Sequence, residues 1–351
     1  MTDETPNTLK GILVGCGFMG GMHAQIYAQL KSVDLVAAVD VNVRSSADKL
    51  KSFAIDAPVY TSLKEALATT DCDFVDICLP TNLHKSNTIT AIEAGKALFC
   101  EKPLARTLGD ADEILAAAQT HNTAAQVGHC IRFWPEYQAL AEFNHSGKGG
   151  NLLSLNLVRR VGRPGYGVGN WLNDASQSGG AALDLHIHDT DFVLSLLGKP
   201  NSFPSRVTKD FSGPTHIFSL LDYDGLTVST EGGWNYPANW GFQMSFQAIY
   251  ENAVLDYDSS NGKGLTICQG ENKPKAMEIA KPDSGKSTSG EGNISDLGGY
   301  YNELLYFTNC LRDDTRPNIA TLEDARASLA LTLDEIESAN PKFSPNASKD
   351  G

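Results

Sequence analysis

Four features that mark particular classes of protein are missing from this chain of 351 residues. Lysine and arginine form no cluster, and the formal net charge of -14 argues against nucleic acid or an anionic membrane as the main partner. No apolar run approaches the roughly 20 residues of a membrane span, and the acidic start lacks the basic and apolar regions of a secretory signal. No C-x-x-C pair occurs among the seven cysteines. We therefore expect a cytoplasmic protein whose cysteines are reduced packing residues.

Low-complexity tracts are also missing, and the mixture of 41% apolar and 20% charged residues is that of an ordinary globular protein. A chain of this length exceeds what one compact core usually spans. Two domains of roughly 120 to 220 residues each are the expectation.

Short apolar runs alternate with amphipathic stretches from Leu9 to about Gly128. Runs such as GILVG, VDLVAAVD and FVDICLP are continuous rather than alternating, which is typical of buried parallel strands connected by helices. The pattern predicts an α/β domain over residues 1–128, with a parallel sheet covered on both faces.

The pattern changes after His129. Segments such as NLLSLNLVRRV, LTVSTEGGW and FQMSFQAIY are β-rich, and several are joined by short turns containing glycine, aspartate or asparagine. Helical segments precede and follow them. We expect residues 129–351 to form an α+β domain with a large, mostly antiparallel sheet.

The first motif, G-C-G-F-M-G, follows a predicted strand and opens a helix. Gly15 permits the tight turn, Gly17 lets backbone amides approach a pyrophosphate, and Gly20 allows the helix to pack closely. Asp40 ends the next strand 20 residues after Gly20, where a carboxylate binds ribose hydroxyls. This register favours a dinucleotide site over a structural glycine-rich turn.

The acid at position 40 also bears on the choice of cofactor. A carboxylate there repels the 2'-phosphate of NADP and accepts hydrogen bonds from the NAD ribose, so NAD is favoured. Arg44 on the following helix would moderate that repulsion, which keeps NADP possible, although a solvated helix charge is the favoured interpretation of Arg44.

Two further motifs, L-P-T-N-L-H at residues 79–84 and E-K-P at residues 101–103, follow predicted strands of the same sheet. Open α/β sheets bind ligands at the carboxyl ends of their strands. The ammonium of Lys102 could polarise a substrate oxygen there, whereas the alternative is a lysine in a surface turn.

The last motif, D-L-H-I-H-D-T-D, begins at Asp184 and precedes an apolar helical run. On a helix Asp184 and His188 are four residues apart and share a face, while His186 points elsewhere. An imidazole beside a carboxylate suits removal of a hydroxyl proton while hydride leaves the same carbon. A metal site is the rival interpretation, but the final ligand position holds Phe192 and an H-x-H pair on a helix splays its imidazoles.

Together these motifs, their order, and V-G-H-C-I-R-F-W-P at residues 127–135 resemble the Gfo/Idh/MocA family of sugar and inositol dehydrogenases. The resemblance implies a Rossmann domain followed by an α/β domain whose open sheet often forms a subunit interface, hence a homodimer or homotetramer. It also implies that Lys102, Asp184 and His188 are catalytic, with His188 as the acid/base. The implied cofactor-binding residues are Gly15, Gly17, Phe18, Met19, Gly20, Asp40, Leu79, Pro80, Asn82, His84, Glu101 and Lys102.

The chain departs from the family pattern at His186, where the family often has glycine. This additional imidazole enters either the substrate pocket or a contact with a neighbouring helix. Asn170 and Trp171 are further candidates to line the sugar or nicotinamide site, with a core position as the alternative for the tryptophan. We therefore predict substrate contacts from Asn170, Trp171, Asp184, His186 and His188, and no metal site.

The function that this implies is reversible hydride transfer between NAD and a secondary alcohol carbon of a sugar, sugar derivative or cyclitol. One alternative holds NAD permanently and oxidises a sugar transiently, so that a glycosidic bond can be cleaved. A non-catalytic NAD-binding sensor is another, but it has no need of the proton-transfer group that His188 offers.

Overall fold

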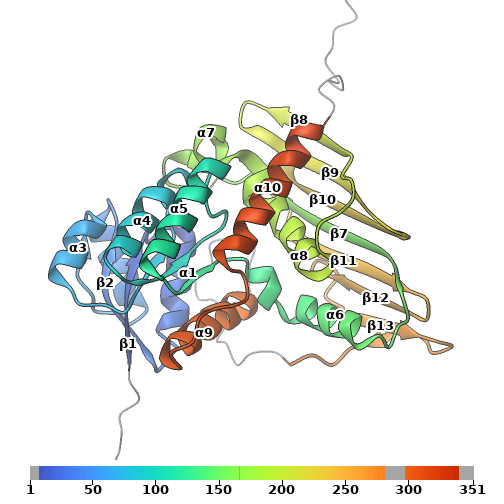
Figure 1. Cartoon of the computed structure of the whole chain (residues 1–351), viewed down its shortest axis with the longest axis horizontal. Coiled ribbons are helices and arrows are strands. Elements are labelled where there is room, and N and C mark those ends of the chain that lie inside the picture. Colours follow the sequence, from blue (N-terminus) through green and yellow to red (C-terminus); the bar gives the residue numbers. More distant parts are fainter. Residues whose placement is uncertain (1–7, 166, 281–296, 340–351) are drawn as a thin grey trace, which may run out of the picture. The chain divides into compact units, whose positions relative to one another are not determined.

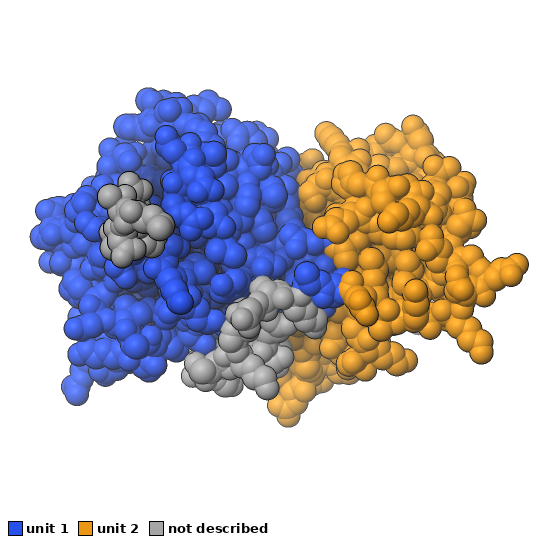
Figure 2. Space-filling view, turned by 90° about the horizontal axis from the view of Figure 1, so that it is seen from below, with its two compact units in different colours: residues 1–138, 166–171, 279–329 blue, residues 139–165, 172–278, 330–351 orange. Residues whose placement is uncertain are grey.

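The computed structural model describes residues 8–165, 167–280 and 297–339. The chain forms two compact units (Figure 2), each built from more than one segment. Unit 1 comprises residues 1–138, 166–171 and 279–329, and unit 2 comprises residues 139–165, 172–278 and 330–351. No helix among the described residues is long and apolar enough to cross a membrane.

Unit 1 contains a six-stranded parallel sheet, here sheet A, in the order β3-β2-β1-β4-β5-β6. The predicted apolar runs form its interior: the residues of β4 are all buried, as are most of those of β1 and β5. The strands are β1 (Leu9–Val14), β2 (Val33–Val39), β3 (Val59–Tyr60), β4 (Phe74–Ile77), β5 (Ala97–Cys100) and β6 (Ala125–Val127).

Helices connect these strands and cover the sheet (Figure 1). They are α1 (Phe18–Tyr27), α2 (Val43–Ser52), α3 (Leu63–Thr69), α4 (His84–Glu93) and α5 (Leu108–His121). The late helix α9 (Gly298–Arg312) also belongs to unit 1, because Phe307 packs edge-on against Phe74 and Phe99 of the sheet. Sheet A ends at Val127, while the division into domains at residues 128 and 129 stays a prediction.

Unit 2 is built on an eight-stranded sheet, here sheet B, in the order β14-β13-β12-β11-β7-β10-β9-β8. Only β7 and β10 pair in parallel, which confirms the predicted mostly antiparallel sheet. The strands are β7 (Leu152–Gly162), β8 (Ser205–Asp210), β9 (Gly213–Tyr223), β10 (Leu226–Tyr236), β11 (Gln243–Tyr250), β12 (Ala253–Asp258), β13 (Thr266–Gln269) and β14 (Lys275–Ala276).

The two faces of sheet B differ. On β9, Ile217 and Leu221 are fully buried, whereas Phe218 and Leu220 are 50% and 53% exposed. Helices α7 (Ala175–Ser178) and α8 (Ile187–Leu197) belong to unit 2, whereas α6 (Pro135–Ser146) and α10 (Leu322–Ser338) each begin in unit 1 and end in unit 2. Helix α8 packs on β7 and β10 on the buried face (Figure 1), so the opposite face, here the outer face, keeps exposed apolar side chains.

All seven cysteines are free thiols, and all but Cys268 are buried. This is consistent with the expected packing role.

Candidate active site

The predicted cofactor motifs of unit 1 gather at one edge of sheet A. The glycine motif follows β1, Asp40 follows β2, residues 79–84 follow β4, and residues 101–103 follow β5. These four strands are neighbours in the order β2-β1-β4-β5. From β1 the chain adds strands first on one side (β2, β3) and then on the other (β4, β5, β6), so the order switches between β1 and β4. Parallel sheets bind ligands at such a switch point, beyond the carboxyl ends of the strands.

The glycine motif makes a turn that larger residues cannot make. Gly15 has a φ of 92°, in the left-handed region. A Cβ on Gly20 would lie 1.8 Å from the carbonyl oxygen of Gly15, so α1 packs directly on the turn. A Cβ on Gly17 would meet no atom within 4 Å, which leaves open space before the first turn of α1. Phe18 and Met19 are partly exposed in that turn.

The carboxylate of Asp40 is held in place by two backbone amides. The N–H of Cys16 donates to its Oδ2 over 2.8 Å, and the N–H of Asn42 donates to Oδ1 over 2.7 Å. Burial, followed by the charge of Asp40, raises the pKa of the Cys16 thiol to about 12, so the cysteine stays protonated. Each carboxylate oxygen keeps a further acceptor site for a ribose hydroxyl.

Lys49 is a cofactor-loop residue that sequence reasoning missed. Its Nζ donates to the carbonyl oxygens of Cys16 and Gly17, each over 3.0 Å, and so ties α2 to the glycine turn. A lysine on a polar helix far from the motif carries no local signal of this contact.

In the loop after β4, Leu79 and Pro80 are partly exposed and Asn82 is exposed, but His84 is buried. Both imidazole nitrogens of His84 face backbone carbonyls at 2.8 Å, those of Leu79 and Pro103. Burial lowers the pKa of His84 although both carbonyls favour the charged ring. His84 therefore connects the loops after β4 and β5, and its imidazole is occupied within the protein.

Glu101 is also buried, with 4% of its surface exposed. Its Oε2 accepts the backbone N–H of Lys102 over 3.1 Å, and its Oε1 lies 3.2 Å from Nε2 of His23 on α1. The carboxylate of Glu101 thus points into unit 1 and holds the backbone of Lys102, which is itself partly exposed.

His23 belongs to a buried polar network under this loop. Its Nδ1 lies 2.8 Å from Oδ2 of Asp76, which also accepts the hydroxyl of Tyr27 over 2.9 Å. Burial and the nearby Glu101 raise the pKa of Glu303 on α9 well above its ordinary value, so this carboxyl is neutral. Sequence reasoning missed the network, although a charged Asp76 inside the apolar run FVDICLP indicates a buried partner.

The predicted catalytic residues of unit 2 lie in a π-turn at Ala182–His186 that continues into α8. Asp184 is partly exposed and His188 is 8% exposed. His186 is fully buried, and its Nε2 lies 3.2 Å from Oε1 of Glu335 on α10. Of the two predicted places for this imidazole, the structure shows the contact with a neighbouring helix.

Asp189 of the same motif is bound by Arg159 of β7 through two hydrogen bonds of 2.8 and 3.1 Å. With His186 bonded to Glu335 and Asp189 to Arg159, these two side chains of the motif already have partners within the protein.

Asn170 and Trp171 lie in a 3-10 segment at Val168–Asn173, and both residues belong to unit 1. Asn170 is exposed with a φ of 59°, and Trp171 is partly exposed. Their predicted contacts with a sugar or with nicotinamide stay predictions. The predicted trio itself is divided, since Lys102 belongs to unit 1 and Asp184 and His188 belong to unit 2.

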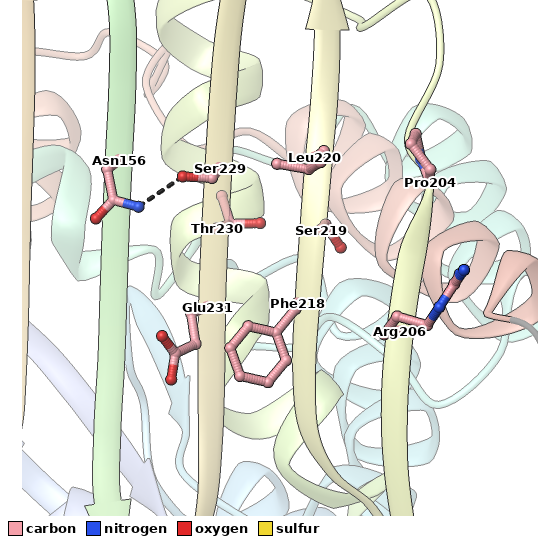
Figure 3. Close-up of a pocket in the computed structure, with 9 residues that line it drawn as sticks. All are labelled: Asn156, Pro204, Arg206, Phe218, Ser219, Leu220, Ser229, Thr230 and Glu231. Carbon is pink, nitrogen blue, oxygen red and sulfur yellow. Dashed lines mark hydrogen bonds between the residues drawn. The ribbon is translucent and has the colours of Figure 1, made fainter. Parts of the chain in front are cut away.

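A pocket of about 430 Å³ lies on the outer face of sheet B (Figure 3). It combines the apolar side chains of Phe218 and Leu220 with Arg206 and Glu231, and Asn156 donates to Ser229 across it. Its remaining lining residues are Pro204, Ser219 and Thr230.

Two family models match this chain. Residues 9–129 match the oxidoreductase family with the NAD-binding Rossmann fold, and residues 137–255 match the Gfo/Idh/MocA C-terminal domain. The chain belongs to the Gfo/Idh/MocA family. It is an NAD-binding oxidoreductase, as its motifs predicted.

Relatives of known activity act on sugars or cyclitols. D-Glucoside 3-dehydrogenase of Escherichia coli K12 is 31% identical over 296 residues, which cover 76% of this chain and 84% of the relative. Inositol 2-dehydrogenase of Burkholderia multivorans is 30% identical over 267 residues, or 74% of this chain and 76% of the relative. Levoglucosan dehydrogenase, solved with NADH and levoglucosan, shares the fold with a TM-score of 0.80 and 21% identity, covering 95% of this chain and 97% of its own.

The residues at the edge of sheet A fit NAD. The open space before Gly17 faces the positive end of α1, whose first turn contains no acidic residue. The oriented carboxylate of Asp40 suits ribose hydroxyls and opposes a 2'-phosphate. Arg44 is exposed on α2, so use of NADP as well stays a prediction.

Proposed function

We propose that this oxidoreductase transfers hydride between NAD and a secondary alcohol carbon of a sugar, sugar derivative or cyclitol. The observation that carries the proposal is the placement of Lys102. The loop of this lysine lies at the same sheet edge as the glycine turn and Asp40, and it is held there by Glu101 and His84. The activities of the glucoside and inositol dehydrogenases support a polyhydroxylated substrate.

Each proposed catalytic group has one task. NAD, when bound, supplies the hydride acceptor. His188 accepts the proton of the reacting hydroxyl, while the C–H electron pair leaves the same carbon as hydride. The ammonium of Lys102 donates a hydrogen bond to the oxygen and stabilises its developing negative charge. Asp184 orients His188 or accepts a hydrogen bond from a neighbouring substrate hydroxyl.

Asn170 and Trp171 are proposed substrate contacts because Asn170 is exposed and Trp171 is partly exposed. A carbohydrate ring packs well on an indole face. His186 is not retained as a substrate contact, because its side chain is fully buried and lies against Glu335.

We also propose that the outer face of sheet B associates with a second copy of the chain, giving a homodimer or homotetramer. When a second copy covers this face, the exposed side chains of Phe218 and Leu220 are removed from water, which favours association. The pocket on this face (Figure 3) offers Arg206 as a polar partner, while its Glu231 is paired with Arg160 and His216.

The experiment is NADH formation across a panel of glucosides, aldoses, anhydrosugars and inositols, repeated with NADP. Lys102→Met and His188→Gln should lower kcat by about 100-fold to 10,000-fold. The exposed Lys31→Met and His121→Gln are matched controls and should leave turnover unchanged.

Turnover that survives in both Lys102→Met and His188→Gln would contradict the assigned roles. NAD that stays bound through purification, with cleavage of glycosides and no net NADH, would favour transient oxidation in a glycosidase or lyase. NAD binding with no reaction of any sugar would favour a sensor.

A further inference from the structure

The segment that carries Asp184 and His188 begins with an unusual backbone. Residues Ala182–His186 form a π-turn, which then continues as the regular helix α8. A π-turn is less favourable than an α-helical turn and occurs often at functional sites. Neighbouring side chains must therefore hold it in place.

One carboxylate on α10 contacts this segment on both sides of His188. Glu335 accepts a hydrogen bond from Nε2 of His186 over 3.2 Å through its Oε1, and from the hydroxyl of Thr190 over 3.0 Å through its Oε2. All three residues are fully buried. The last residue of the π-turn and the first turn of α8 are thus bonded to the same group.

Sheet B leaves room for the imidazole at this point. A Cβ on Gly232 of β10 would lie 2.8 Å from the Cβ of His186 and 2.9 Å from its Nδ1. A larger residue at position 232 would collide with the ring, so strand, imidazole and carboxylate fit together as one packed unit.

The contact between His186 and Glu335 is also electrostatic. Arg159 is bound to Asp189 through two hydrogen bonds, and the imidazole of His186 lies 3.2 Å from Glu335. Burial lowers the pKa of His186, but Glu335 and Asp189 together outweigh burial, so the pKa lies above its ordinary value. Arg159 acts in the opposite direction, and Tyr223 of β9 also faces Glu335.

We propose that the buried His186–Glu335 ion pair is a positioning device, which holds the π-turn so that Asp184 and His188 present their side chains for proton transfer. His186 acts through its neighbours and does not touch the substrate. The inference rests on the proposed roles of Asp184 and His188. It explains why an imidazole stands within the motif without being exposed at the site.

The test uses the full chain with Glu335→Gln, which keeps the shape and removes the charge, and His186→Gln, which keeps an N–H donor. Glu337→Gln is the matched control, because Glu337 is exposed on the same helix. The two variants should lower kcat by about tenfold to a hundredfold, as expected when a catalytic group is misplaced by about 1 Å, with the Kd of NAD and the KM of the sugar unchanged. The double variant should lose no more than either single variant.

The pH profile separates positioning from a merely structural role. In the wild type, kcat should fall as the pH rises through the raised pKa of His186, because deprotonation removes the ion pair. Glu335→Gln should move that fall to lower pH, whereas Glu337→Gln should not move it. If His186 instead contacts the sugar, His186→Gln will raise KM with little change in kcat, and the proposal is overturned.

A readout that does not need turnover is the NMR signal of the His188 imidazole in histidine-labelled protein. Glu335→Gln should shift this signal and its titration midpoint, and Glu337→Gln should leave both unchanged. An unchanged His188 signal in Glu335→Gln overturns the proposal whether or not any sugar is oxidised. If Glu335→Gln fails to fold, Thr190→Val removes one of the two bonds to Glu335 and serves the same comparison.

Discussion

Nε2 of His23 lies 3.2 Å from Oε1 of Glu101, and the two side chains are only 0% and 5% exposed. Because Asp76 contacts the other nitrogen of the ring, a single imidazole separates two buried carboxylates. Glu101 in turn accepts a hydrogen bond from the backbone N–H of Lys102. The buried charge network therefore holds the backbone of the proposed catalytic lysine in place.

Replacing His23 by alanine should lower the free energy of unfolding by about 3 to 5 kcal/mol, because two buried carboxylates lose their cation. Urea denaturation measures this directly. His121→Ala, at an exposed position of α5, should change stability by less than about 0.5 kcal/mol. A His23→Ala variant as stable as the wild type would show that the network contributes no net stability.

The contribution of His23 should depend on pH. Burial lowers the pKa of His23, but Cys78 and Asp76 outweigh burial and raise it well above its ordinary value. The stabilisation is therefore fully present below the unfolded pKa of about 6.5 and is lost as the pH rises through the folded pKa. Unfolding curves across neutral and alkaline pH should show this decline in the wild type and not in His23→Ala.

Alanine substitutions at two glycines of the same turn should affect different properties: one should impair NAD binding and the other should lower stability. Gly17→Ala fits without a clash, so the melting temperature should stay near that of the wild type, but the methyl group fills the space where the dinucleotide is expected. Gly20→Ala places a Cβ 1.8 Å from the carbonyl oxygen of Gly15 and should destabilise the fold. Thermal denaturation and NAD titration calorimetry separate the two outcomes; unimpaired NAD binding by Gly17→Ala would refute the assigned cofactor position.

Asp40→Ala should weaken NAD binding by about tenfold or more, since each 1.4 kcal/mol of lost hydrogen bonding is a factor of ten. The binding of NADP should weaken less, because the repulsion of a 2'-phosphate is removed at the same time. Asp48→Ala, at an exposed position of α2, is the matched control. Equal losses for NAD and NADP would argue that Asp40 does not face the ribose.

Phe218→Asp should dissociate the proposed homo-oligomer, because it removes an exposed apolar ring from the outer face of sheet B and places a second carboxylate opposite Glu231. Size-exclusion chromatography with light scattering measures the mass. Val41→Asp introduces the same charge at a position of unit 1 that is 82% exposed and should leave the mass unchanged. A wild type that is already monomeric at high concentration would exclude this interface.

The architecture followed from local patterns. Continuous apolar runs predicted the strands of sheet A, because buried parallel strands have no polar face. β-rich segments joined by short turns predicted the antiparallel pairing of sheet B, because strands joined by a tight turn run in opposite directions. The glycine spacing predicted the turn before α1, which Gly15 and Gly20 bear out by their backbone angle and close approach.

Local patterns predicted the roles of individual polar residues less well. His84 and Glu101 were expected at the cofactor, but their side chains point into unit 1, where they hold the loops in place. Motif position indicates which strand end a residue occupies, whereas the direction of its side chain depends on partners elsewhere in the chain.

The sequence by itself determined the order of elements, the place of the cofactor edge and the residues that could transfer a proton, because these depend on periodicity and short-range spacing. Only the tertiary structure decided that His23 is held between carboxylates and that His186 is paired with Glu335, 149 residues away. Buried charges require partners, but that requirement does not specify which distant residue supplies them. The choice is made in the folded chain, where Glu335 of α10 meets His186 and Phe307 of α9 packs on sheet A.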